Sequence, residues 1–405
     1  MLRARRRYNP IVFVLIAATV IMSAGLGPRA ALGLFLLPIT GEHVVSVSLL
    51  AFAIAIQNLA WGAAQPLAGS LADRRGPTVV VVAGALISAA GLLLVAWHTD
   101  PVTIMLGLGV LVGLGQSAMT FAVVISAVSR ASEPAFRATA VALAAAGGSL
   151  GQVILIPIAA IAIANFGFHW AFVVLAGIVL AAGPMGYFLI RRDLPTAVAA
   201  PGESTIVQTT WSAIWTAVRD SNYLFLTAGF FACGFQLAFI GNYLPAYLAL
   251  CHVAGGVGAA TLATVGFFNI IGTYGFGRLM NRFQPQHLLV VLYSIRATAV
   301  LAFIVTPPSG VTSIAFGVVM GLTWLGTVPL TNGIVTRLFG LSNLGTLFGV
   351  CFLSHQAGAF MGAFFGGLSI AWTGSYTTMW IATIVVGYAA ALLNVPIRTR
   401  AVATA

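Results

Sequence analysis

The sequence predicts an all-α integral membrane protein with twelve transmembrane helices arranged as two pseudo-symmetric six-helix bundles. Three observations support this fold class. Hydrophobic residues make up 60% of the 405-residue chain and charged residues only 6%, and the mean hydropathy is +1.04, a balance that no water-soluble domain of this size sustains. Apolar segments of spanning length recur along the whole chain, and the second half repeats the first.

Twelve segments bounded by turn residues and charges reach the roughly 20 mostly apolar residues that a hydrocarbon core requires. The chain opens with RARRRYN, but no short apolar region with a cleavage site follows, so we expect the first helix to be retained. The expected spans are 11–39, 47–71, 78–98, 102–128, 138–164, 169–190, 223–250, 257–277, 287–306, 310–336, 344–372 and 376–396.

The arginines predict the orientation in the membrane. All eighteen basic residues are arginine, and sixteen lie at the two ends or in loops that follow even-numbered spans. Because cytoplasmic loops carry the excess of positive charge, we expect a multi-pass protein of the cell inner membrane with both termini cytoplasmic. This distribution also accounts for the pI near 10.4, so we expect no nucleic-acid partner. The loop arginines are Arg74, Arg75, Arg130, Arg137, Arg191, Arg192, Arg219, Arg278, Arg282 and Arg337.

A repeat at an offset of about 207 residues defines the domain organisation. GSLADR at 69–74 matches GRLMNR at 277–282, and FLLP at 35–38 matches NYLP at 242–245. The only long polar stretch lies between the two copies. We therefore expect an N-terminal six-helix bundle over 1–190, a cytoplasmic linker over 191–221 with a short amphipathic helix near its end, and a C-terminal six-helix bundle over 222–405.

The loop after the second span carries a specific motif. GSLADRRG at 69–76 resembles the signature Gly-x-Leu-x-Asp-Arg-x-Gly of the major facilitator superfamily. The resemblance implies a transporter whose two halves rock around a site near the midplane, and a cytoplasmic gate formed by Gly69, Asp73, Arg74 and Gly76. Asp73 would cap or salt-bridge a neighbouring helix end. The second copy keeps Arg282 but has Asn281 in place of the acid, which predicts a weaker latch.

The predicted interior contains cations and no carboxylate. The acids are Glu42, Asp73, Asp100, Glu133, Asp193, Glu203 and Asp220, all in loops or at helix ends. Transporters of organic cations and sugar/proton symporters of this superfamily usually carry an interior acid, so this absence argues against both. Arg29, Arg296 and His355 fall within spans instead, and a charged residue there is a functional candidate by default. The simplest partner for them is an anionic substrate.

A second, shorter resemblance supports an anion. PRAALGLF at 28–35 resembles the helix-one Pro-Lys segment of the monocarboxylate porters, with arginine in place of lysine, and the oxalate/formate exchangers share cationic core helices. The aspartate and arginine of helix eight in that family fall near Asn269 and Thr273, so this charge pair is missing here. The expected substrate-binding residues are Arg29, Gln152, Gln236, Asn242, Trp324 and His355, and the expected coupling residues are His355 and Arg296.

Each candidate charge has a structural alternative. Arg29 could extend to the periplasmic interface, Arg296 could bond backbone carbonyls of a neighbouring helix, and His355 could be a hydrogen-bonded packing residue. The sequence predicts a secondary active transporter of a small organic anion, a monocarboxylate, coupled to proton symport, with membrane lipid around it and a monomer sufficient for function. The alternatives are an exporter of neutral or amphipathic molecules, and a non-transporting sensor. No nucleotide loop, catalytic set or metal cluster is present, so we expect no enzyme, cofactor or metal.

Overall fold

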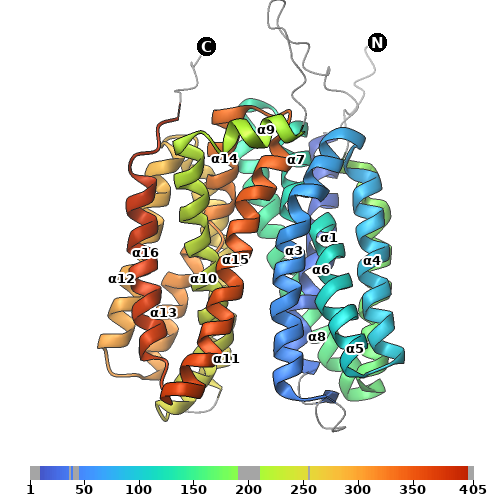
Figure 1. Cartoon of the computed structure of the whole chain (residues 1–405), viewed down its shortest axis with the longest axis vertical. Coiled ribbons are helices and arrows are strands. Elements are labelled where there is room, and N and C mark those ends of the chain that lie inside the picture. Colours follow the sequence, from blue (N-terminus) through green and yellow to red (C-terminus); the bar gives the residue numbers. More distant parts are fainter. Residues whose placement is uncertain (1–9, 36–37, 40–44, 190–209, 254–255, 400–405) are drawn as a thin grey trace, which may run out of the picture.

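The computed structural model describes residues 10–35, 38–39, 45–189, 210–253 and 256–399, and over these residues the secondary structure is helical. Figure 1 shows two helical bundles side by side, α1–α8 in one and α10–α16 in the other. The predicted fold class is therefore confirmed. The proposed boundaries at 190/191 and 221/222 stay a prediction, because 190–209 lie outside the described residues.

The first half departs from six separate, regular α-helices in its fourth span and where its fifth and sixth spans join. The elements are α1 (Pro10–Ala31) with the 3-10 turn η1 (Leu32–Phe35), α3 (Val47–Arg75), α4 (Pro77–Trp97), the run α5 (Pro101–Ile104), η2 (Met105–Leu111), α6 (Val112–Met119) and α7 (Phe121–Ala131), and α8 (Pro134–Ala182) with η3 (Gly183–Leu189). The fourth span contains the π-helical segment η2 and breaks at Thr120. The fifth and sixth spans join at Gly167, whose φ of 80° suits glycine.

The second half repeats this pattern of intact and broken helices. Its elements are α9 (Thr210–Ala217), α10 (Ser221–Leu250), α11 (Val257–Leu279), α12 (Pro285–Val305), α13 (Gly310–Thr323), α14 (Thr327–Phe339), α15 (Leu344–Thr373) and α16 (Thr377–Asn394). The tenth span breaks between α13 and α14, as the fourth span breaks between α6 and α7. The short helix α9 falls where an amphipathic surface helix was expected.

Length and hydropathy alone identify nine spanning stretches among the described residues. The stretch Pro134–Leu189 contains two spans, because the chain turns at Gly167. α3 and α11 add two more, since they have 29 and 23 residues but are less apolar. Both carry amides, such as Asn58 and Asn269, that are buried against other helices. These additions bring the described helices to the twelve spans of the prediction.

Small residues hold the equivalent helix pairs of the two halves close together. In the first half, Gly147 and Gly151 of α8 lie against α1, where a Cβ on Gly151 would meet the Ser23 backbone. In the second half, Gly358 and Gly362 of α15 lie against the backbone of α10 in the same way. The glycine-rich runs thus lie at helix contacts, as expected for small residues in membrane bundles.

The glycine contacts predict the effect of adding a single methyl group. Gly151→Ala forces a Cβ into the Ser23 backbone and should destabilise the protein by about 1–3 kcal/mol, the usual cost of overpacking. Gly177→Ala is the matched control on the same helix, since nothing lies within 4 Å of the position that a Cβ would take there. Thermal unfolding in detergent should show a lower Tm for Gly151→Ala only. Equal Tm values would contradict the close approach of α1 and α8.

Candidate functional site

The two halves touch along a strip of α3 and α15. Backbone contacts join Gly69 to Gly345 and Pro66 to Gly349, and Gly62 lies against the Gln356 side chain. These positions are three, four or seven residues apart on each helix, so they form one face of it. We call this strip, with Asn58 and Asp73 at its two ends, the α3–α15 seam. It closes the half of the molecule that the arginine distribution predicts to be cytoplasmic.

Asp73 holds the two halves together at its end of the seam, which is the end farther from Asn58. Its Oδ2 accepts hydrogen bonds from the Thr346 backbone nitrogen at 2.9 Å and hydroxyl at 3.2 Å, and its Oδ1 accepts from the Gly345 nitrogen at 3.3 Å. Arg130 Nη1 donates to Oδ1 at 2.6 Å. A carboxylate at the amino terminus of α15 is favoured by the helix dipole. This arrangement ties α3, α7 and α15 together at one point.

The second motif copy has a different arrangement. Gly277 lies against Ala142 of α8, which reproduces the close approach of Gly69. Asn281 and Arg282 are exposed, whereas Asp73 of the first copy forms an ion pair with Arg130. Arg74 is likewise exposed, whereas Gly76 ends α3 with a φ of 85°. The latch contacts are thus concentrated in the first copy.

An aromatic cluster lies further along the seam. Trp61 stacks against Phe121 of its own half, with ring centroids 6.1 Å apart, and contacts Phe352 of the other half in a tilted arrangement at 4.9 Å. Phe352 contacts Phe230 at 6.3 Å. All four rings are buried. We call Trp61, Phe121, Phe230 and Phe352 the aromatic floor, because Arg29 lies over Trp61 and His355 contacts Phe230 and Phe352.

Arg29 lies directly over this floor. Its guanidinium carbon is 5.6 Å from the Trp61 ring centroid, which is cation–π distance. Nη2 donates to Asn58 Oδ1 at 2.8 Å, and Nε is buried without a hydrogen-bond partner. The side chain is half-buried and turns toward the middle of α3. Within the described residues no carboxylate lies within ion-pair distance of it.

A chain of amides connects Arg29 to the other half. Gln356 Nε2 donates to the Asn58 backbone oxygen at 3.3 Å and lies 3.5 Å from Asn58 Oδ1. Gln356 Oε1 lies 3.0 Å from His355 Nδ1. The imidazole stacks on Phe352 at 5.1 Å and contacts Phe230 in a tilted arrangement at 4.8 Å. Arg29 and His355, which the sequence placed in separate helices, therefore belong to one network.

Arg296 is fully buried and bonded to neighbouring dipoles. Nη2 donates to the backbone oxygens of Thr323 and Trp324, and Nη1 donates to Gln236 Oε1 at 3.3 Å and to Cys233 Sγ at 3.4 Å. Thr323 and Trp324 end α13, where helical carbonyls lack intrahelical partners and the helix dipole favours a cation. Arg296 thus fills the break in the tenth span.

The remaining predicted site residues have different surroundings. Gln236 is buried beside Arg296 and donates to the Thr383 oxygen at 3.0 Å. Trp324 is half-buried among the apolar residues of the second half. Asn242 is exposed on α10. Gln152 lies on α8, but its side chain is outside the described part of the structure.

The seam also contains residues that were not among the predicted site. Asn58 and Gln356 carry the contact between Arg29 and His355, and Trp61 lies beneath Arg29. Both amides lie inside apolar spans, and this was the available sequence signal. Their pairing needs the distance between two helices about 300 positions apart in sequence, so it was not accessible from the sequence.

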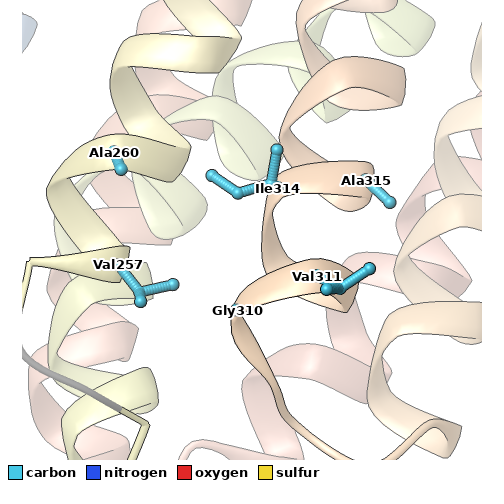
Figure 2. Close-up of a pocket in the computed structure, with 6 residues that line it drawn as sticks. All are labelled: Val257, Ala260, Gly310, Val311, Ile314 and Ala315. Carbon is cyan, nitrogen blue, oxygen red and sulfur yellow. The ribbon is translucent and has the colours of Figure 1, made fainter.

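An apolar hollow of about 540 Å³ lies elsewhere in the second half. Figure 2 shows the ends of α11 and α13 that form it, with Val257, Ala260, Gly310, Val311, Ile314 and Ala315. Its lining has no polar side chain, and it includes none of the cationic or amide groups described above. It suits a hydrocarbon chain and has no group that would recognise a charged substrate.

The fold and the network together define a class of protein. Two six-helix halves meet along one side, with charged and amide groups between them, which is the architecture of secondary membrane transporters. A family model described as Major Facilitator Superfamily matches residues 11–363. The chain belongs to the major facilitator superfamily, whose members are transporters and not enzymes.

The similar proteins support the same family. The uncharacterized MFS-type transporter YcxA of Bacillus subtilis (strain 168) is 25% identical over 370 residues, covering 89% of each chain. Monocarboxylate transporter 11 of Homo sapiens is 26% identical over 344 residues, covering 82% of this chain and 70% of that protein. Both match this chain over most of its length at modest identity.

Solved structures match over nearly the whole chain. The Escherichia coli fucose:proton symporter FucP aligns with a TM-score of 0.71 at 16% identity, covering 95% of this chain and 98% of that one. The proton:xylose symporter XylE aligns with a TM-score of 0.68 at 13% identity, covering 95% and 94%. At these identities the likeness establishes the fold.

The hydrogen bonds of Arg296 predict that replacing this residue lowers the stability of the protein. Arg296→Leu leaves the Thr323 and Trp324 carbonyls without their donor, and each orphaned buried group should cost about 1–3 kcal/mol. Thermal unfolding should therefore show a clearly lower Tm. Arg282→Leu is the matched control, because Arg282 is exposed. An unchanged Tm for Arg296→Leu would show that these carbonyls do not depend on the arginine.

Proposed function

We propose that this transporter moves a small organic anion, a monocarboxylate, by alternating access and in symport with a proton. The observation that carries the proposal is the state of Arg29. Its side chain is half-buried within the first predicted span, its Nε has no partner, and the described residues supply one hydrogen-bond acceptor to it, a neutral amide. A charge in such a place is costly, and an anionic substrate would supply the missing countercharge.

The guanidinium of Arg29 favours a carboxylate over a neutral ligand. Arginine presents planar, parallel donors that match the two oxygens of a carboxylate, and charge-assisted bonds of this kind are roughly twice as strong as neutral ones. The Trp61 ring beneath Arg29 adds an apolar face against which the carbon part of a small acid could lie. The similarity to Monocarboxylate transporter 11 is in keeping with such a substrate.

His355 is the proposed proton site. Histidine is the side chain whose charge changes near neutral pH, and the sequence has no carboxylate within its predicted spans. His355 joins Arg29 through Gln356 and Asn58. A bound anion and a protonated imidazole attract each other, so the two would bind cooperatively. The substrate would then cross the membrane without net charge from the anion.

The proposal extends to the placement of the chain. Both termini would be cytoplasmic in the cell inner membrane, with the bundles 1–190 and 222–405 joined by 191–221. The gate of Gly69, Asp73, Arg74 and Gly76, with Arg282 in the second copy, would open when the α3–α15 seam separates. A monomer contains every group that this mechanism uses.

Replacement of Arg29 tests the substrate class. Wild-type protein in detergent should gain thermal stability with acetate, pyruvate, lactate or benzoate at millimolar concentration, because a ligand at 100 times its Kd adds about 2.7 kcal/mol. Arg29→Gln should lose this gain, and Arg219→Gln, which replaces an exposed arginine outside the gate, should keep it. The matched neutral amides and esters test the alternative. If these stabilise wild type and Arg29→Gln equally, an exporter of neutral or amphipathic compounds is the better assignment.

Replacement of His355 tests the coupling. In proteoliposomes, uptake of the same carboxylates should rise as the external pH falls from about 8 to 6, across the titration range of histidine. His355→Gln keeps a hydrogen-bonding side chain but cannot carry the proton, so its uptake should become pH-independent and should not respond to an imposed proton gradient. Full pH dependence in His355→Gln would place the proton elsewhere.

A further inference from the structure

Asn58 lies where the two halves meet, and its side-chain oxygen faces a donor from each half. Its Oδ1 accepts from Arg29 Nη2 at 2.8 Å and lies 3.5 Å from Gln356 Nε2. Its Nδ2 donates to the Ile54 oxygen at 3.2 Å, which fixes the orientation of the amide on α3. The side chain is only 2% exposed. Asn58 is therefore held with one oxygen pointing at the substrate arginine and at the other half.

That oxygen occupies the place that a substrate oxygen needs. A guanidinium binds a carboxylate with two prongs along either the Nε and Nη2 edge or the two Nη atoms, and both edges include Nη2. Nη2 is the atom bonded to Asn58, while Nε has no partner. Each edge uses one of the two Nη2 hydrogens, so a carboxylate on the edge that faces Asn58 must displace the Asn58 oxygen, and we take this edge to be the one that the substrate uses. The amide is thus a neutral stand-in for the anion.

The oxygen that the anion frees has one other donor nearby. Gln356 Nε2 lies 3.5 Å from Asn58 Oδ1 and is bonded to the Asn58 backbone oxygen at 3.3 Å. A turn of the Gln356 amide toward Asn58 Oδ1 also moves Gln356 Oε1, which is the partner of His355 Nδ1. A change at Arg29 in one half therefore reaches the proposed proton site in the other half through two side chains.

We propose that Asn58 is a positioning residue that holds the place of the carboxylate in the empty transporter and transmits its arrival through Gln356 to His355. The inference rests on the proposed anion site at Arg29. It assigns a role to Asn58 and Gln356, neither of which needs to remain in contact with the substrate. Asn58 sets the affinity of Arg29 for the carboxylate. Gln356 transmits occupation of the site to the α3–α15 seam.

The experiment uses full-length protein in proteoliposomes, with pyruvate, lactate, acetate and benzoate as probes, and measures KM and kcat of uptake. Asn58→Ala removes the competing oxygen, so KM should fall about threefold to tenfold, the scale of one hydrogen bond to a charged group. Its kcat should fall at least tenfold, because the signal to Gln356 is lost. Gln356→Ala should leave KM within twofold and should lower kcat to the same extent.

Two further variants sharpen the test. Asn58→Asp places a permanent carboxylate beside Arg29, so KM should rise at least tenfold and the thermal gain from each probe should vanish. The double variant Asn58→Ala/Gln356→Ala should have a kcat no lower than that of the slower single variant, since residues in one chain are not additive. Asn165→Ala and Asn165→Asp are matched controls, because Asn165 is exposed and also donates to the carbonyl four residues earlier.

The outcomes separate this inference from the proposed function. If Arg29→Gln loses the probes while Asn58→Ala and Gln356→Ala keep wild-type KM and kcat, the anion site stands and the transmission role is wrong. Additive losses of kcat in the double variant would also overturn it. If no probe binds wild type, the anion site fails and the inference fails with it. Size-exclusion profiles and Tm values identify any variant that does not fold, and Asn58→Ser then replaces Asn58→Ala.

Discussion

The cost of a guanidinium in a low-dielectric interior is the constraint on which this structure depends. With no carboxylate in the predicted spans, the chain must satisfy its interior arginines with dipoles or with something from outside. Arg296 takes the first solution, because the end of α13 supplies two carbonyls and Gln236 a third oxygen. Among the described residues Arg29 is bonded to one amide oxygen, and the Nε of each arginine is buried without a hydrogen-bond partner. Two similar residues in the sequence thus have different electrostatic environments.

The contact between the two halves is a second feature on which the structure depends. Glycines on α3 and α15 allow the two helices to approach closely from Asp73 to Asn58, and Asp73 fixes one end of this seam by capping α15. The aromatic floor fills the space next to it. Arg29 and His355 lie where the seam ends, so a ligand bound between them would contact both halves. Such a position is what alternating access requires of a substrate site.

Much of the fold could be predicted from the sequence. The spans, the repeat and the arginine distribution each follow from hydropathy or loop charge, which act locally along the chain. The GSLADRRG motif indicated the family, and the match over residues 11–363 agrees with it. The candidate site was only partly accessible. Arg29 and His355 were visible as charges in apolar spans, but Asn58 and Gln356 were two among several interior amides.

The sequence by itself determined that this chain crosses a membrane twelve times, repeats itself, and places cations without acids in its interior. Composition and periodicity are enough for that, since the bilayer selects segments by length and polarity. Only the tertiary structure decided which arginine is bonded to several neutral acceptors and which is bonded to one among the described residues. That depends on the distance from each guanidinium to carbonyls and amides on other helices, and such distances arise only when the helices pack.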